Sequence, residues 1–187
     1  MKRAYMIHGW GGSSKEGWFP SVKKKLEGKG INVIAFEMPD TENPKIDEWI
    51  KFLRENIKDI NKETVLIGHS IGCQAIMRFL EMLPESAKVK CCIFVAPWFD
   101  LTDETYEDEE DKEITKPWIE TPIDFEKVKK HSDKFIAIFS DNDPFVNLSN
   151  ADLFKERLEA KIITKSNRNH FLTFKHVNDI PELFNLF

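Results

Sequence analysis

The sequence has few cysteines, and their placement excludes a framework of disulfide bonds. There are three among 187 residues, an odd and sparse set. Cys91 and Cys92 are adjacent, so they point to opposite faces of any strand that contains them. We interpret both, together with Cys73, as reduced residues of the core.

Long apolar runs and an excess of basic residues are also absent. No stretch approaches the roughly 20 apolar residues that a membrane span requires, and a strand-like run begins at Arg3 in place of a targeting segment. The net charge is -5, with no basic stripe to neutralise phosphates. We therefore expect a cytoplasmic protein that binds neither nucleic acid nor a membrane.

Internal repeats and linkers are missing as well, which favours one domain over residues 1–187. Short apolar runs alternate with longer segments of helical period. Strands are expected at 4–8, 32–38, 64–69, 89–96, 134–140 and 161–165. Helices are expected at 19–29, 45–60, 71–83, 125–131, 149–159 and 179–187. This alternation predicts an α/β fold, a three-layer sandwich with a mostly parallel six-stranded sheet and helices on both faces.

An acidic insertion at 100–122 interrupts the alternation. Between Asp103 and Glu113 there are eight carboxylates and a single basic residue, Lys112. We interpret the segment as an exposed excursion, because like charges repel and stay hydrated. The alternative is a lid, since the insertion leaves the carboxyl end of a strand, where ligands bind in open α/β sheets. It lacks the glycine and terminal glutamate of a calcium-binding EF-hand loop, so no metal is assigned.

The sequence Gly-His-Ser-Ile-Gly at 68–72 is the most informative motif. It follows the apolar run 64–67 and precedes a helical segment, which is the setting of a strand-to-helix nucleophile elbow. The turn strains the backbone of the serine, and a side chain at either glycine would collide with a neighbouring element. A serine hydrolase with Ser70 as its nucleophile is therefore the leading hypothesis.

A serine nucleophile needs a histidine and a carboxylate, and both follow in the order typical of α/β-hydrolases. Asp143 lies in the loop after the fifth expected strand, and His170 lies in the loop after the sixth. Asp141 competes with Asp143, which is preferred because it is deeper in the loop and precedes Pro144. Parallel strands bring these loops to one edge of the sheet, so Ser70, Asp143 and His170 form the predicted catalytic triad.

The tetrahedral intermediate also needs two donors for its oxyanion. We expect the backbone N–H groups of Ile71, which opens a helix, and of Trp10, in the glycine-rich loop after the first strand. Trp10, Trp98 and Phe99 are the expected lining of the substrate pocket, with Trp118 as a further candidate. These aromatic walls predict small or aromatic acyl groups rather than long lipids.

The same glycine-rich loop supports a rival interpretation. Gly9 and Gly11 after a strand, with Glu37 at the end of the next one, resemble an incomplete dinucleotide-binding fingerprint. Ser14 stands where the third glycine is needed, and bulky Trp10 occupies the turn. Nucleotide binding is therefore the weaker hypothesis.

Several motifs together resemble the serine hydrolase family of retinoblastoma-binding protein 9. They are Gly9-Trp10-Gly11-Gly12, Trp18-Phe19-Pro20, Met38-Pro39-Asp40, Trp49, the elbow, Ala96-Pro97-Trp98-Phe99-Asp100, Ser140-Asp141-Asn142-Asp143-Pro144 and His170-Phe171. The resemblance spans nearly the whole chain. It implies a compact α/β-hydrolase without the first two strands of larger relatives, and a triad of Ser70, Asp143 and His170.

Two departures limit what the resemblance carries over. The family usually has glycine before the catalytic histidine, where this chain has Asn169, a residue that tolerates left-handed backbone angles. The motif Leu-x-Cys-x-Glu, which the partner binding in the family's name would use, is absent. No protein partner is therefore assigned.

Together these features predict a serine esterase that forms an acyl-enzyme on Ser70 and needs no cofactor and no metal. Its expected partner is a small-molecule ester, and thioesters and amides stay open because the same groups cleave them. The alternative is a weakly active or non-catalytic protein of hydrolase fold that binds a partner or small ligand.

Overall fold

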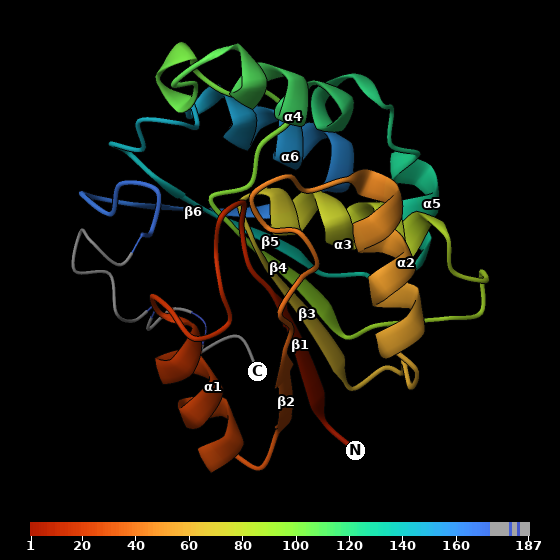
Figure 1. The fold of residues 1–187 in the computed structure, drawn as a ribbon. Helices are drawn as coiled ribbons and strands as arrows, with labels where there is room; N and C mark the ends of the chain where they lie inside the picture. The colour runs from red at the N-terminus through yellow and green to blue at the C-terminus, as the bar shows by residue number, and fades with distance from the viewer. Residues whose placement is uncertain (173–179, 181–182, 184–187) are drawn as a thin grey trace.

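Six strands form one parallel sheet in the structure, a computed structural model that describes residues 1–172, 180 and 183. Their order across the sheet is β2-β1-β3-β4-β5-β6, and each neighbouring pair is parallel (Figure 1). The strands are β1 Arg3–Ile7, β2 Asn32–Ala35, β3 Thr64–His69, β4 Cys91–Val95, β5 Phe135–Ser140 and β6 Lys161–Lys165.

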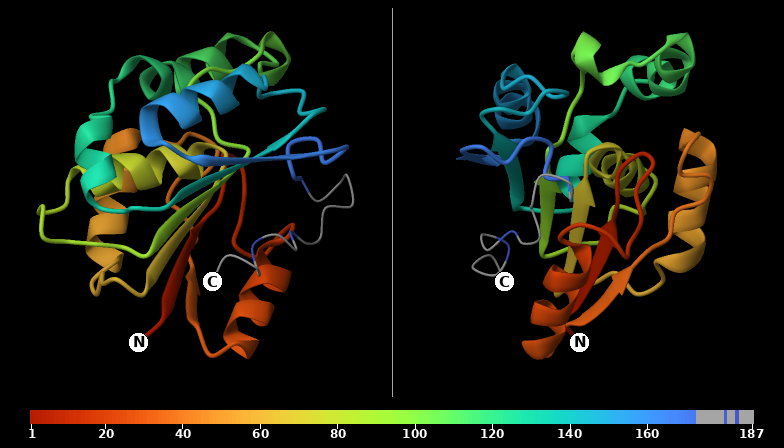
Figure 2. Two further views of the ribbon diagram at one scale, coloured as in Figure 1. Left: turned by 180° about the vertical axis from the view of Figure 1, so that it is seen from behind. Right: turned by 60° about the vertical axis from the view of Figure 1, so that its left-hand side comes forward.

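Helices cover both faces of this sheet, which confirms the predicted α/β sandwich. They are α1 Phe19–Gly28, α2 Ile46–Asn56, α3 Ile71–Glu81, α4 Glu109–Glu120, α5 Phe125–Lys130 and α6 Ser149–Leu158, with a short 3₁₀ turn at Asp103–Thr105. Helix α1 packs on one face and α2 lies on the other (Figures 1 and 2). The helix expected at 179–187 falls almost wholly outside the described residues.

The strand order places the loop after β1 beside the turn after β3, at the carboxyl edge of the sheet. From β1 the chain moves outward to β2 and then returns to the opposite side of β1 as β3. Ile7 at the end of β1 is in register with Gly68 near the end of β3. The order therefore reverses between β1 and β3, and such switch points are where ligands bind in open α/β sheets.

The apolar core lies in two layers, one on each face of the sheet. The central strands are buried on both faces, which is why β3 and β4 read as continuous apolar runs. Cys91 and Cys92 belong to different layers, as their adjacency predicts. All three cysteines are buried and free.

Most residues of the acidic insertion are exposed, and its second half forms helix α4, which was not predicted from the sequence. The Asp108 side chain caps the helix by accepting from Glu110 N and Asp111 N, and carboxylates in the first turn suit the positive end of the helix dipole. Trp118 is 1% exposed and its indole N–H donates to Pro44 O at 2.8 Å. Clustered charge therefore starts this helix, and Trp118, further along, anchors it to the core.

Arg78 of α3 fixes the end of α4 to the rest of the molecule. Its guanidinium donates to three carbonyl oxygens at the end of that helix, those of Trp118 at 3.0 Å, Thr121 at 2.7 Å and Pro122 at 3.4 Å. Burial lowers the pKa of the Arg78 side chain. The carbonyls at a helix C-terminus lack partners within the helix, so this buried arginine satisfies them.

Helix α3 approaches β1 so closely that only glycine fits at position 72. A Cβ atom there would lie 2.5 Å from both Ile7 O and His8 O. At Gly68 it would lie 2.8 Å from the backbone N and Cα of Cys73. Gly72 therefore allows α3 to pack against the end of β1, and Gly68 allows the start of α3 to pack against β3.

We expect Gly72→Ala to lower the free energy of unfolding by about 2–3 kcal/mol, because backbone atoms must move to admit the new methyl group. The matched control is Gly28→Ala, where a Cβ atom would meet nothing within 4 Å. That variant should be neutral or stabilised by up to about 1 kcal/mol. Urea denaturation measures both, and equal effects at the two positions would contradict this account of the elbow.

Candidate active site

Ser70 lies at the turn between β3 and α3 in the strained conformation that a nucleophile elbow requires. Its backbone angles are φ 51 and ψ -124, a combination that residues with a side chain seldom adopt. The Ser70 N–H donates to Val95 O at 2.9 Å, which ties the turn to the end of β4. The strain is thus held by the neighbouring strand and by the glycines around it.

His170 and Asp143 form a buried pair. His170 Nδ1 lies 2.8 Å from Asp143 Oδ2, and the two side chains are only 7% and 2% exposed. A carboxylate can only accept, so Nδ1 carries the proton and Nε2 is left as an acceptor. The other carboxylate oxygen accepts from Phe145 N and Val146 N at 2.9 and 3.2 Å, which fixes its orientation.

Asp141 has a different role. It is exposed, and its carboxylate accepts from Asn167 N at 2.8 Å, a hydrogen bond that lowers the pKa of Asp141. Between the two acidic candidates, the geometry pairs Asp143 with His170. Asp141 instead connects the loop after β5 to the loop that carries the histidine.

Further hydrogen bonds hold these two loops together. Asn169 N donates to Asn142 Oδ1 at 2.8 Å, and Arg168 N donates to Ser140 Oγ at 2.9 Å. Asn169 has a φ of 48, the left-handed angle that glycine would otherwise provide. Sequence reasoning missed the roles of Ser140 and Asn142, although their place in a polar run beside Asp143 is a usable signal.

His69 is a third residue whose role sequence reasoning missed. Its Nε2 donates to the backbone oxygen of His170 at 2.9 Å, and the two rings pack 5.1 Å apart. Burial lowers the pKa of His69 to about 3. It is therefore neutral at ordinary pH and supports the loop of His170 without titrating.

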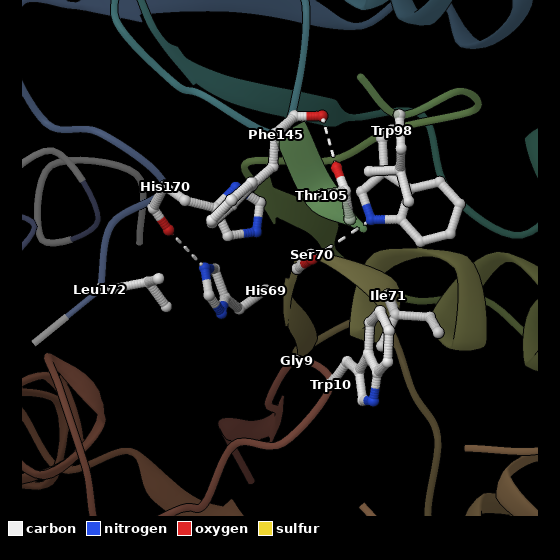
Figure 3. Close-up of a pocket in the computed structure, with 11 residues that line it drawn as sticks. Gly9, Trp10, His69, Ser70, Ile71, Trp98, Thr105, Phe145, His170 and Leu172 are labelled. Atoms are coloured by element: carbon white, nitrogen blue, oxygen red, sulfur yellow. Dashed lines mark hydrogen bonds between the residues drawn. The ribbon is translucent and has the colours of Figure 1, made fainter. Parts of the chain in front are cut away.

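One cavity of about 150 Å³ is lined by Ser70, His170 and His69 together. Its lining is Gly9, Trp10, His69, Ser70, Ile71, Trp98, Leu101, Thr105, Phe145, His170 and Leu172 (Figure 3). Trp10 and Ile71, the expected oxyanion donors, thus lie around the same cavity as the serine, and Trp98 is at its wall. Leu101 and Thr105 come from the first part of the acidic insertion.

Phe99 and Trp118 do not line this cavity, so their expected place in the substrate pocket needs correction. Phe99 lies in a bend beyond the end of β4 and its side chain is directed toward α6. Its ring stacks on Phe154 of α6 at 4.3 Å. Trp118 packs against Trp49 at 5.8 Å, beneath α4.

The glycine-rich loop after β1 is held in a way that disfavours nucleotide binding. His8 Nδ1 donates to Gly9 O at 2.8 Å, while His8 Nε2 accepts from Met38 N at 3.0 Å. Glu37, which would bind a ribose, instead accepts from the Ser14 hydroxyl at 2.6 Å. The acidic residue is therefore occupied by the loop itself.

Within residues 1–172, 180 and 183, no three His, Cys, Asp or Glu side chains are grouped as metal ligands would be. Across the same part of the chain, no helix has the length and apolar character needed to cross a membrane.

The chain is similar to known proteins along nearly its whole length. A family model described as serine hydrolase matches residues 4–187. This protein belongs to the serine hydrolase family. Rat RBBP9, a serine hydrolase, is 30% identical over 173 residues, which cover 90% of this chain and 87% of RBBP9. The resemblance seen in the motifs is confirmed.

Bacterial and archaeal proteins are also similar to this serine hydrolase. YdeN of Bacillus subtilis (strain 168) is 26% identical over 191 residues, 99% of this chain and 94% of YdeN. The crystal structure of YdeN has a TM-score of 0.90 at 25% identity, covering 100% of this chain and 96% of that one. A carboxylesterase structure from Nitrososphaera gargenis has a TM-score of 0.72 at 16% identity, covering 99% and 88%, and shows the shared fold.

The depressed pKa of His69 predicts how the stability of this serine hydrolase depends on pH. Below the usual histidine value of 6.5 the unfolded chain binds a proton at His69, while the folded protein does not until about pH 3. Acid in this window therefore favours unfolding, with a slope that approaches about 1.4 kcal/mol per pH unit for this residue.

We expect His69→Gln to remove this contribution. Its free energy of unfolding should fall less steeply than that of the wild type between about pH 6 and pH 4, because glutamine does not titrate. Denaturation curves at several pH values measure the two slopes. Parallel slopes would show that folding does not lower the pKa of His69.

Proposed function

We propose that this serine hydrolase cleaves small carboxylic esters through a covalent acyl-enzyme on Ser70. The observation that carries the proposal is the buried pair of His170 and Asp143, whose histidine lines the same cavity as the strained serine. A hydroxyl becomes a useful nucleophile only when a nearby base takes its proton. Here Nε2 of His170 is the acceptor, because Nδ1 is committed to Asp143.

In the first half of the reaction, Ser70 Oγ attacks the carbonyl carbon and its proton passes to His170 Nε2. The tetrahedral intermediate collapses, the C–O bond to the alcohol breaks, and His170 returns the proton to the departing oxygen. In the second half, His170 takes a proton from water, which attacks the acyl carbon; the C–Oγ bond then breaks, His170 returns the proton to Ser70 Oγ, and the acid is released. Asp143 holds the imidazole in position and stabilises its protonated form.

The backbone N–H groups of Trp10 and Ile71 are the proposed donors to the oxyanion. Ile71 is the first residue of α3, so its N–H has no acceptor in a preceding helical turn and lies at the positive end of the helix dipole. Trp10 is held by its indole N–H, which donates to Glu42 O at 2.8 Å. Two such donors stabilise the charge that develops on the carbonyl oxygen.

The size of the cavity favours a small acyl group. About 150 Å³ is the volume of an apolar cavity that holds a molecule of roughly the size of benzene. Trp98, Leu101 and Phe145 give the cavity apolar walls. Short aliphatic and single-ring aromatic acyl groups fit these dimensions, and long lipid chains exceed them.

Fluorophosphonate labelling read by intact mass tests the activated serine. We expect the wild type to be labelled and Ser70→Ala to be unlabelled. The His170→Ala and Asp143→Asn variants should react at least about 10³-fold more slowly than the wild type. The matched control is Asp141→Asn, which keeps the oxygen that accepts from Asn167 and should react at the wild-type rate. A folded wild type without label would instead favour the alternative of a binding protein.

A series of nitrophenyl esters tests the acyl preference. We expect kcat/KM to be highest for acetate, butyrate or benzoate and to fall about tenfold or more by dodecanoate, because the longer chain does not fit the cavity. Leu101→Ala should move the optimum to longer chains by enlarging the cavity. Leu148→Ala is the control, since Leu148 is 39% exposed and lies outside the cavity lining. An optimum at long chains in the wild type would contradict the proposal.

A further inference from the structure

Ser70 Oγ has a hydrogen-bond partner that is not part of the triad. The indole Nε1 of Trp98 donates to it at 3.2 Å (Figure 3). No hydrogen bond joins Ser70 Oγ to His170 in the described part of the chain. Trp98 is 2% exposed, so this donor is shielded from water.

We propose that Trp98 is a positioning residue for the nucleophile, an inference that rests on the proposed role of Ser70. A serine hydroxyl has one hydrogen to donate and two lone pairs, whereas an indole N–H only donates. With Trp98 on one lone pair, the hydroxyl hydrogen is left to point toward the base and the second lone pair toward the substrate. The indole thereby selects the orientation of Ser70 Oγ from which attack begins.

The position of Trp98 is itself fixed by buried polar groups on α3. Gln74 Nε2 donates to the backbone oxygen of Trp98 at 3.2 Å, and Gln74 Oε1 accepts from Arg78 at 3.2 Å. Gln74 and Arg78 are spaced four residues apart in α3, so they lie on one side of the helix. Hydrogen bonds thus connect the end of α4, through Arg78, Gln74 and Trp98, to the nucleophile.

The same N–H follows the charge on the serine oxygen during turnover. In the acyl-enzyme Oγ is an ester oxygen and a weak acceptor. When the deacylation intermediate collapses, the C–Oγ bond breaks, its electron pair returns to Oγ, and His170 supplies the proton. A donor already aimed at Oγ stabilises that growing charge, so its contribution is larger in the transition state than in the acyl-enzyme.

The experiment separates the N–H group from the shape of the side chain. Trp98 is replaced by benzothienylalanine, which keeps the two fused rings but has sulfur in place of the N–H, and in a second variant by Trp98→Phe. We expect kcat for a short nitrophenyl ester to fall about five- to tenfold in both, the rate equivalent of one hydrogen bond. KM of the benzothienylalanine protein should stay within about twofold, because the cavity keeps its shape.

Trp118→Phe is the matched control. Trp118 is also a buried tryptophan with a hydrogen-bonded N–H, but its partner is Pro44 O, away from the cavity. Its kcat should stay within about twofold of the wild type. A merely structural role for Trp98 predicts instead that the benzothienylalanine protein, which packs like the wild type, also turns over like it.

Wild-type kcat in the benzothienylalanine protein would overturn the proposal. A higher kcat would overturn it too, because it would show that the indole holds the serine away from His170. Both results require that the wild type reacts with fluorophosphonate. If a folded wild type does not react, the proposed function fails first, and the two failures are therefore distinguishable.

Discussion

The backbone strain at Ser70 is the constraint on which the site depends. A positive φ at this residue projects the hydroxyl out of the turn, and such an angle persists only where the surroundings leave no alternative. Here the backbone at the end of β1 lies in close contact with Gly72, and the start of α3 lies in close contact with Gly68. The Ser70 N–H donates to the carbonyl oxygen at the end of β4. Strand β3 lies between β1 and β4 and leads directly into α3, so the order of the elements supplies all three contacts.

Asp143 and His170, the proposed partners of Ser70, are positioned in a different way. Asp143 and His170 lie on irregular loops, and their geometry depends on hydrogen bonds between those loops rather than on a strand or helix. The Asn142 side chain accepts from the backbone beside His170, and His69 donates to the carbonyl of His170 itself. Backbone strain thus positions Ser70, the proposed nucleophile, while a buried polar network positions His170, the proposed base.

The sheet, the elbow, and the pairing of Asp143 with His170 could be predicted because each follows from local pattern and chain order. Helix α4 could not, since its clustered charges predicted only exposure, and the burial of Trp118 depends on Pro44, far away in the sequence. The direction of Phe99 was missed because it lies in a bend after β4, where a side chain's direction does not follow from a regular period. His69 was missed because its partner is the backbone of His170, and backbone acceptors leave no mark in a sequence.

The acidic insertion contributes Leu101 and Thr105 to the cavity wall but none of the predicted triad or oxyanion residues. The far end of the insertion is attached to α3 by hydrogen bonds from Arg78 to backbone carbonyl oxygens. Residues of any type supply a backbone carbonyl, so these bonds do not depend on the side chains of the insertion. Substitutions in this segment can therefore reshape the cavity while the nucleophile and its base keep their hydrogen bonds. The shape of the cavity and the geometry around Ser70 thus depend on different parts of the chain.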